Sequence, residues 1–140
     1  METLNLKIAV IDDSEFDNKM FSRRLKQYTD ELALGQDFNF DIQAYTAVNS
    51  FLNELDNTFD VVILDYYLDE GITGKELIST IKFKSPSCKI LIISQARNVE
   101  TALQTLRMGA NEFIHKDDLY AMPRICFFVE EALRSKYSLH

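Results

Sequence analysis

The sequence predicts an α/β domain built on a five-stranded parallel sheet with helices on both faces. Short apolar runs alternate five times with longer stretches of helical periodicity, which is typical of parallel sheets with right-handed crossovers. Three runs are apolar throughout, as in strands covered on both faces, whereas the second and fifth are half polar, as at sheet edges. The predicted strands span residues 6–11, 38–45, 59–65, 89–94 and 112–115.

Local signals support a helix after each strand. Ser14 fits an N-cap, and Glu15 and Asp17 lie in the first turn, where the helix dipole favours carboxylates. Gly109 fits the stop of the fourth helix, and Pro123 fits the first turn of the last. The predicted helices span residues 14–28, 47–56, 74–82 and 98–108, and a last helix with Pro123 in its first turn runs to about Lys136.

The apolar residues of two helices define the faces that we expect to pack on the sheet. In the first helix this stripe consists of Phe16, Met20, Phe21, Leu25 and Tyr28. In the fourth helix the residues expected to point inward are Val99, Ala102, Leu103 and Leu106.

The composition indicates one ordinary globular domain. We expect a single domain over residues 1–140, with a core from about 6 to 136 and no output domain after it. The net charge of −7 argues against a nucleic-acid surface, which needs a basic face. With no apolar segment of membrane-spanning length and no signal peptide, the expected location is the cytoplasm. Cys88 and Cys126 match no metal-ligand spacing and are expected to be buried thiols.

Polar side chains stand at the carboxyl ends of four predicted strands. Asp12 and Asp13 follow the first strand, Asp65 ends the third, Ser94 ends the fourth, and Lys116 follows the fifth. In a parallel sheet these ends share one edge, where ligands and chemistry collect in open α/β folds. We therefore expect three carboxylates, a hydroxyl and an ammonium to converge there.

Such a cluster needs a neutralising cation. A pair of like charges roughly 4 Å apart costs about 4 kcal/mol at an effective dielectric near 20. Hard oxygen donors with room for water suit Mg²⁺, which would also neutralise an incoming phosphoryl group. The residues thus point to a phosphoryl-transfer site with Asp65 as the acceptor nucleophile, Lys116 pairing with a phosphoryl oxygen and Ser94 donating a hydrogen bond.

This ordered set resembles a response-regulator receiver domain over about residues 6–136. The positions that carry the resemblance are Asp12, Asp13, Asp65, Ser94, Gly109, Ala110, Phe113 and Lys116. The resemblance implies the doubly wound, flavodoxin-like (βα)5 fold. It also implies signalling in a two-component system or phosphorelay, by a switch rather than an enzyme.

The resemblance assigns roles at the site. Asp65 would accept a phosphoryl group from a phosphohistidine of a sensor histidine kinase or a histidine phosphotransfer protein. Mg²⁺ would be held by Asp12, Asp13, Asp65 and the main-chain carbonyl of Tyr67. Lys116 would pair with the phosphoryl group.

The resemblance also implies a switch and an output surface. Ser94 would move toward the phosphoryl group, and Phe113 would swing inward behind it. The fourth helix, fifth strand and fifth helix would then contact a downstream protein target, with the receiver a monomer or a phosphorylation-dependent dimer. On the last helix, Phe127 falls off the core face with Arg124 and Glu131 near it, so these three residues are a candidate partner surface.

The sequence departs from the family pattern at several positions. Asp117 follows Lys116 where proline, often cis, is usual, and Gln95 follows Ser94 where a small residue is usual. The loop from Asp65 to Gly74 is one residue longer than the commonest spacing, with Asp69 where proline is frequent. These departures affect turn geometry and access, but they remove no reactive group.

Two alternatives stay open beside the switch. A Mg²⁺-dependent phosphatase with an aspartate nucleophile would want that nucleophile at the first strand, with a second aspartate two residues later, where Tyr67 follows Asp65 here. The chain can also be the N-terminal receiver of a larger sensory protein. His115 is expected to be a strand-end or edge residue rather than a phosphodonor.

Overall fold

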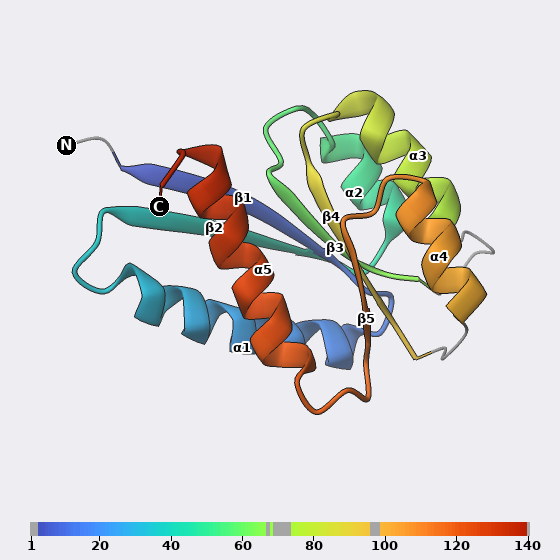
Figure 1. Cartoon of the computed structure of the whole chain (residues 1–140), viewed down its shortest axis with the longest axis horizontal. Coiled ribbons are helices and arrows are strands. Elements are labelled where there is room, and N and C mark those ends of the chain that lie inside the picture. Colours follow the sequence, from blue (N-terminus) through green and yellow to red (C-terminus); the bar gives the residue numbers. More distant parts are fainter. Residues whose placement is uncertain (1–2, 67, 69–73, 96–98, 140) are drawn as a thin grey trace.

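The computed structural model describes residues 3–66, 68, 74–95 and 99–139, and it has the predicted α/β architecture (Figure 1). Five parallel strands form one sheet in the order β2-β1-β3-β4-β5. The strands are β1 (Leu4–Ile11), β2 (Phe38–Tyr45), β3 (Val61–Asp65), β4 (Lys89–Ser94) and β5 (Glu112–His115). The helices are α1 (Glu15–Ala33), α2 (Val48–Glu54), α3 (Gly74–Lys84), α4 (Val99–Arg107) and α5 (Ala121–Lys136). The predicted fold class is confirmed.

The sheet places its polar strands at its edges, as the alternation predicted. β2 and β5 are the outer strands, and both are only partly buried. β3 and β4 lie inside the sheet and are buried almost throughout. β1 pairs in register with β3 on one side and with β2 along eight residues on the other.

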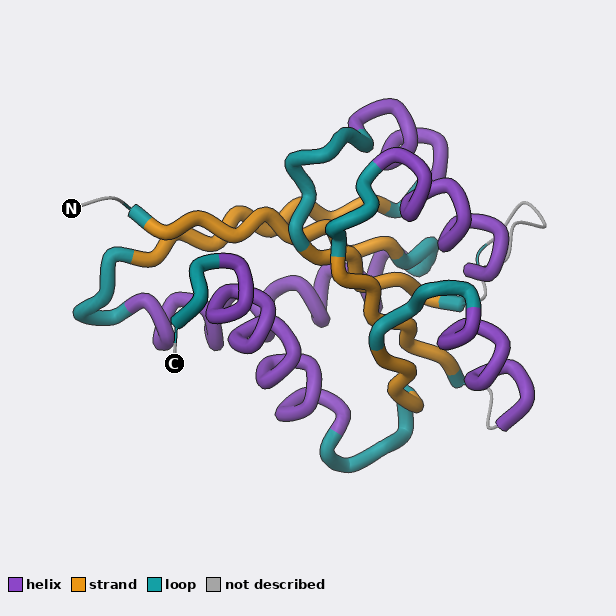
Figure 2. The backbone as a smooth tube through the Cα atoms, turned by 45° about the horizontal axis from the view of Figure 1, so that its top comes forward, coloured by secondary structure: helices purple, strands orange, loops and turns teal. Residues whose placement is uncertain are grey.

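Helices cover both faces of the sheet (Figure 2). On one face α1 and α5 pack over a core that includes Ile8, Ile63 and Val129. On the other face α2 and α3 pack over a core that includes Phe51 and Ile78. This doubly wound arrangement leaves the carboxyl ends of the strands at one edge, between the helices of both layers.

The predicted boundaries of the first helix were wrong at its C-terminal end. We expected a connection over 29–37, but α1 continues to Ala33 because Thr29 faces the core and its hydroxyl donates to the carbonyl of Lys26. The chain leaves the helix at Gly35, where φ is +70°, a conformation that glycine adopts without strain. α5 begins at Ala121, so Pro123 lies in its first turn, as predicted.

The expected inward face was wrong for α4 and partly right for α1. In α1, Leu25 is buried and Phe21 packs against the core as predicted, but Phe16 is 72% exposed and Met20 is 41% exposed. Asn18 and Thr29 are the other buried residues of this helix. In α4 the residues Val99, Leu103 and Leu106 are exposed, and the one buried residue of the helix is Thr105. Periodicity located the apolar stripes but not the direction in which each stripe points.

Two further sequence predictions concern cysteines and membrane segments. Cys88 and Cys126 are both buried free thiols, as expected, and burial raises the pKa of Cys88 to about 12 and that of Cys126 to about 11. Over the residues that the structure describes, none of the helices combines the length and the apolar character that a bilayer crossing requires.

The segment after α5 is hydrogen-bonded to the amino end of β1. The Tyr137 hydroxyl accepts a hydrogen bond from the Asn5 amide and donates one to the Asn5 carbonyl, each 2.9 Å long. Lys136 Nζ lies 3.0 Å from a carboxylate oxygen of Asp60, which also accepts the amide of Lys7. These contacts lie at the amino ends of the strands, opposite the edge that carries the polar cluster.

Candidate functional site

Three carboxylates meet at the carboxyl edge of the sheet. Asp12 and Asp13 follow β1, and Asp65 ends β3, which pairs directly with β1. One carboxylate oxygen from each of the three residues lies within 4.8 Å of the others. The sequence prediction that these side chains converge is therefore confirmed.

An ammonium group that follows the outer strand β5 reaches into this cluster. Lys116 Nζ lies 2.9 Å from Asp65 Oδ2 and 3.5 Å from Asp12 Oδ2. The Lys116 amide donates to the Ser94 carbonyl at 2.8 Å, so the turn after β5 is bonded to the end of β4. Ser94 is completely buried at the end of β4, and β4 is the neighbour of β3, which carries Asp65.

A buried asparagine positions the main chain that carries Asp12. The side-chain amide of Asn18 donates to the carbonyl of Asp12 at 3.1 Å and to that of Tyr45 at 2.8 Å. The Ser22 hydroxyl in turn donates to Asn18 Oδ1. Asn18 thereby joins the ends of β1 and β2. Sequence reasoning missed it, although it is a polar residue seven positions before Leu25, on the same face of α1.

The local environment shifts the pKa values of two members of the cluster. Burial raises the pKa of Asp12 above its ordinary value, despite the Ser14 amide and the Lys116 ammonium, which both lower it. Burial alone would lower the pKa of Lys116, but the hydrogen bond and the charge of Asp65, together with Asp12, outweigh burial and raise it. Among the described residues, the three carboxylates outnumber the Lys116 ammonium, and their hard oxygen donors fit a divalent cation such as Mg²⁺.

The raised pKa of Asp12 predicts that the metal-free protein gains stability when this charge is removed. A carboxyl whose pKa is raised by folding stabilises the fold fully when the pH is below its pKa in the unfolded chain. That stabilisation is lost as the pH rises through its pKa in the folded protein. Asp12→Asn keeps the acceptor for the Ser14 amide, so at neutral pH it should raise the free energy of unfolding by about 1 kcal/mol. Urea unfolding in EDTA at neutral pH measures the change. An unchanged or lower stability would contradict it, and Asp30→Asn on the exposed face of α1 is the control.

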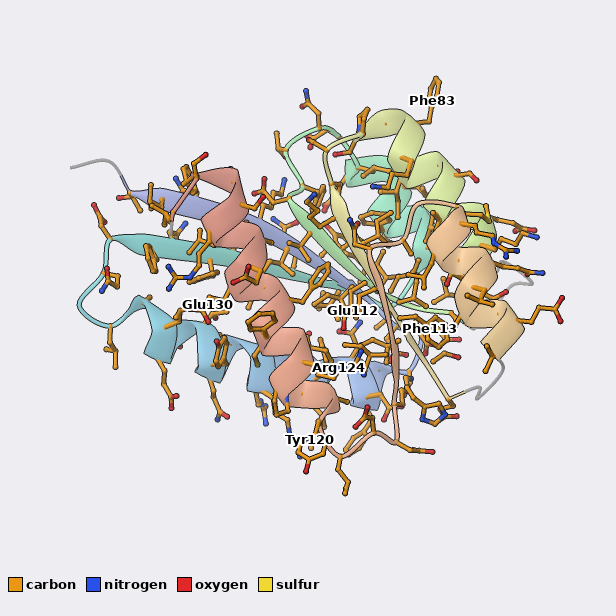
Figure 3. The ribbon with its side chains drawn as sticks, viewed as in Figure 1. Phe83, Glu112, Phe113, Tyr120, Arg124 and Glu130 are labelled. Carbon is orange, nitrogen blue, oxygen red and sulfur yellow. The ribbon has the colours of Figure 1, made fainter. Side chains whose placement is uncertain are left out.

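Phe113 and Tyr67 are the two remaining residues proposed for the site by resemblance. Phe113 lies on β5 opposite Ile92, is half-buried, and packs against the core under α2 and α3 (Figure 3). Tyr67, whose main-chain carbonyl was expected to bind the metal, lies outside the described residues.

The candidate partner surface on α5 is solvent-facing as predicted. Phe127 is 63% exposed, and Glu131 is exposed as well. Arg124 forms ion pairs with Glu112 on β5 at 2.8 Å and with Asp118 at 3.2 Å, which tie the first turns of α5 to the edge strand (Figure 3).

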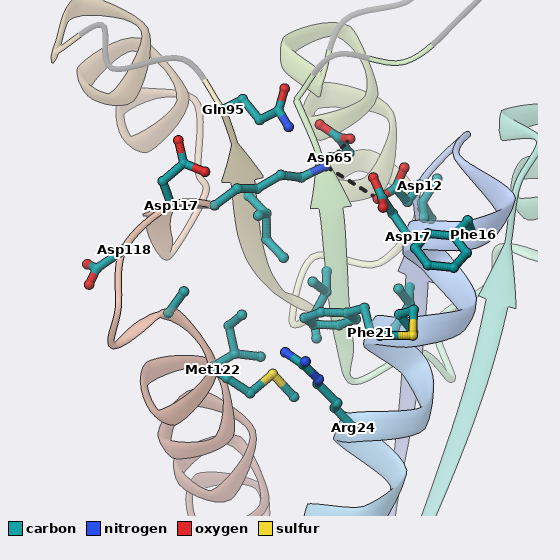
Figure 4. Close-up of a pocket in the computed structure, with 18 of the residues that line it drawn as sticks. Asp12, Phe16, Asp17, Phe21, Arg24, Asp65, Gln95, Asp117, Asp118 and Met122 are labelled. Carbon is teal, nitrogen blue, oxygen red and sulfur yellow. Dashed lines mark hydrogen bonds and ion pairs between the residues drawn. The ribbon is translucent and has the colours of Figure 1, made fainter.

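A hollow of about 470 Å³ opens beside the acidic cluster, between α1 and the beginning of α5 (Figure 4). Asp65 and Lys116 border it, and Phe16, Met20 and Met122 line its apolar part. The two exposed residues of the α1 stripe thus border an opening next to the site rather than the core.

His115 ends β5, as the sequence predicted for an edge histidine. Its Nε2 lies 2.8 Å from the carbonyl oxygen of Gln95, and its Nδ1 accepts the amide of Asp117 at 3.1 Å. Sequence reasoning did not anticipate either contact.

Comparisons with known proteins agree with this geometry. The family model described as the response regulator receiver domain matches residues 8–122, which include the ends of all five strands. A Rickettsia felis protein described as an NtrX-like response regulator is 29% identical over 113 residues, 79% of this chain and 22% of that protein. A cyclic di-GMP phosphodiesterase of Thermotoga maritima is 33% identical over 63 residues, 45% of this chain and 17% of that protein. The chain therefore spans about a fifth of the length of these relatives.

Solved structures are similar over nearly the whole chain. The beryllofluoride-activated receiver domain of DrrB, a Thermotoga maritima protein, has a TM-score of 0.75 at 24% identity and covers 92% of this chain and 97% of its own. A receiver domain protein from Clostridium thermocellum has a TM-score of 0.77 at 20% identity and covers 96% of this chain and 99% of its own. At these identities the structures bear on the fold alone.

Proposed function

Because the chain belongs to the response regulator receiver domain family, we propose that it is a phospho-accepting switch with Asp65 as the acceptor. A phosphohistidine of a sensor histidine kinase or a histidine phosphotransfer protein is the proposed donor. Members of this family are generally signalling switches rather than enzymes, so the phosphatase alternative is not pursued.

The observation that carries the proposal is the charge arrangement around Asp65. A carboxylate that accepts a phosphoryl group must be reached by a donor that brings more negative charge into a cluster of three carboxylates. The Lys116 ammonium, 2.9 Å from Asp65 Oδ2, is one group that reduces the electrostatic repulsion between the donor and the carboxylates. Asp12, Asp13 and Asp65 would hold Mg²⁺ with the main-chain carbonyl of Tyr67, and the bound ion would neutralise phosphoryl oxygens.

The proposed step forms one bond and breaks another. A carboxylate oxygen of Asp65 attacks the phosphorus, the phosphorus–nitrogen bond to the donor histidine breaks, and the electron pair of that bond stays on the imidazole nitrogen. The product is an acyl phosphate on Asp65. Lys116 then pairs with a phosphoryl oxygen, and the Ser94 hydroxyl donates to another.

A solved structure of the same fold contains a divalent ion. A response regulator from Burkholderia pseudomallei, 19% identical with a TM-score of 0.67 over 94% of this chain and 74% of its own, was solved with a phosphorylated aspartic acid and a calcium ion. In the chain described here, the hard oxygen donors of the three carboxylates favour Mg²⁺, whose sites in proteins commonly combine one or two carboxylates with water and phosphate oxygens.

The proposed switch joins the site to the surface of α4, β5 and α5. Movement of Ser94 toward the phosphoryl group would open space behind it, and Phe113 would turn inward from the edge strand. The apolar residues Val99 and Leu103, which α4 exposes to solvent, support a partner surface on this side.

A direct test is incubation with Mg²⁺ and acetyl phosphate. The intact mass should increase by one phosphoryl group, and peptide mapping should place that group on Asp65. Omitting Mg²⁺ or adding EDTA should prevent the increase. Equal modification with and without the metal, or modification of another residue, would overturn the proposal.

Phe127 offers a test of the proposed output surface. Phe127→Ala should leave the phosphorylation of Asp65 unchanged and weaken the association of the beryllofluoride-activated protein about tenfold, since exposed aromatic residues often dominate interfaces. Sedimentation velocity over a concentration series measures this association. Phe83→Ala, which removes an even more exposed aromatic side chain from α3, is the matched control. Identical association of all three proteins would reject this surface as a dimer contact.

A further inference from the structure

We propose that His115 is a positioning residue for phosphoryl transfer, because its imidazole joins the ends of β4 and β5 and thereby fixes the Lys116 ammonium on Asp65. This inference rests on the proposed function. His115 touches no reacting group itself, so its effect must pass through the main chain that carries Lys116.

The imidazole ring bridges two segments that each supply a residue to the site. Its Nε2 is bonded to the carbonyl of Gln95, the residue directly after Ser94, at 2.8 Å. Its Nδ1 accepts the amide of Asp117, the residue directly after Lys116, at 3.1 Å. Together with the 2.8 Å bond from the Lys116 amide to the Ser94 carbonyl, the ring closes a small network around the turn that orients Lys116.

The partners of the ring determine where its proton lies. An amide N–H can only donate, so Nδ1 must be the acceptor, and a carbonyl oxygen can only accept, so Nε2 must carry the proton. Only the neutral imidazole satisfies both contacts. The imidazolium would present an N–H to the Asp117 amide, and that contact would be lost.

Among the residues that the structure describes, the charged groups of this turn are Lys116, Asp117 and Asp118, and Arg124 on α5 pairs with Asp118. Asp118 is paired with Arg124, and the hydrogen bond from the Tyr120 amide, with smaller contributions from Arg124 and His115, lowers the Asp118 pKa. An added proton on Nδ1 would remove the bond from the Asp117 amide. Acidification should therefore loosen the turn only in proteins that carry this histidine.

The amide of Asp117 makes the bridge possible. Its one hydrogen bond among the described residues is the bond to His115 Nδ1, so a proline at 117 would remove that bond and no other. Proline would instead fix φ of residue 117 through its ring. The histidine bridge and a proline are thus two ways of stiffening the same turn.

The test compares rates of Asp65 phosphorylation by acetyl phosphate with saturating Mg²⁺, from about pH 8 to about pH 5.5, the range in which histidine ordinarily changes charge. At the upper end His115→Ala should be about fivefold to tenfold slower than wild type, as expected for losing two hydrogen bonds. The wild-type rate should fall more steeply on acidification than the rate of His115→Ala. His140→Ala removes the other histidine of the chain and should follow the wild type.

A second variant separates positioning from general damage to the fold. In the double variant His115→Ala with Asp117→Pro, the proline should recover about half or more of the loss in the logarithm of the phosphorylation rate. The rate of the double variant should depend on pH as weakly as that of His115→Ala. Equal rates and pH profiles for wild type and His115→Ala would overturn the inference while leaving the proposed function intact. A double variant as slow as His115→Ala would overturn it as well.

Nitrogen NMR of the imidazole gives a readout that does not depend on phosphorylation. Near pH 8 the wild-type His115 should show a protonated Nε2 and an unprotonated Nδ1, and a proton on Nδ1 would overturn the bridge. If the wild type is not modified at Asp65, the proposed function fails and the positioning role fails with it. The NMR result then shows whether the bridge exists as a purely structural contact.

Discussion

Asp65→Asn should abolish phosphorylation by acetyl phosphate, with no modified protein detectable by intact mass under conditions that convert most of the wild type. The side-chain amide is nearly isosteric with the carboxylate but lacks the nucleophilic oxygen that attacks phosphorus. The charge balance also changes, because Lys116 loses its 2.9 Å partner at Asp65 Oδ2. This is the largest effect that the structure predicts for a single side chain.

Two comparisons make the Asp65→Asn result specific. Asp30→Asn, which changes a surface carboxylate on α1, should be phosphorylated like the wild type. Circular dichroism should show that Asp65→Asn is folded, since the strand that carries residue 65 is held by its pairing with β1 and β4. Residual phosphorylation of the folded variant at another carboxylate, at a rate close to that of the wild type, would refute the assignment of the acceptor.

Lys116→Met should slow phosphorylation about 100-fold, the effect typical of removing one group that stabilises charge in a transition state. The metal-free protein should also lose about 3 kcal/mol of stability, because the carboxylates of Asp12 and Asp65, both largely shielded from solvent, lose the ammonium that pairs with both of them. The pKa of Lys116 is raised in the folded state, so this stabilisation is complete at neutral pH and is lost only as pH rises through that value.

Rates of phosphorylation and urea unfolding in EDTA measure the two consequences of Lys116→Met. Lys19→Met removes an exposed ammonium from α1 and should change neither quantity appreciably. Mg²⁺ should restore part of the stability of Lys116→Met, because the ion supplies the missing positive charge to the same carboxylates. A variant as fast and as stable as the wild type would exclude Lys116 from the site.

The sequence was sufficient to predict which side chains converge at the site. Asp12, Asp65 and Lys116 each follow a run that reads as a strand, and a parallel sheet brings such positions to one edge whatever the details of packing. The contacts of Asn18 and His115 could not be predicted in this way. Asn18 bonds to Tyr45, and His115 bonds to Gln95, which are 27 and 20 residues away along the chain. Such bonds depend on strand register and loop path, which residue periodicity does not encode.

The direction of an apolar helical stripe was the main property that the sequence left undetermined. Val99, Leu103 and Leu106 form a regular stripe, but apolar residues on the solvent-facing side of a helix have the same sequence spacing as apolar residues on its core-facing side. The same ambiguity applies to Phe16 and Met20, which border the hollow beside Asp65. Both errors involve helices next to the site, where apolar side chains lie at the surface rather than in the core.

The hydrogen bonds between Tyr137 and Asn5 have a practical consequence for experiments. They hold the end of α5 beside the beginning of β1, so both ends of the described chain lie on the side remote from Asp65 (Figure 1). A biotin tag or a fluorescent protein joined at either end would leave the reactive edge facing away from the attachment. The domain can therefore be immobilised on a biosensor chip in one orientation and screened against candidate phosphodonors without blocking the acceptor.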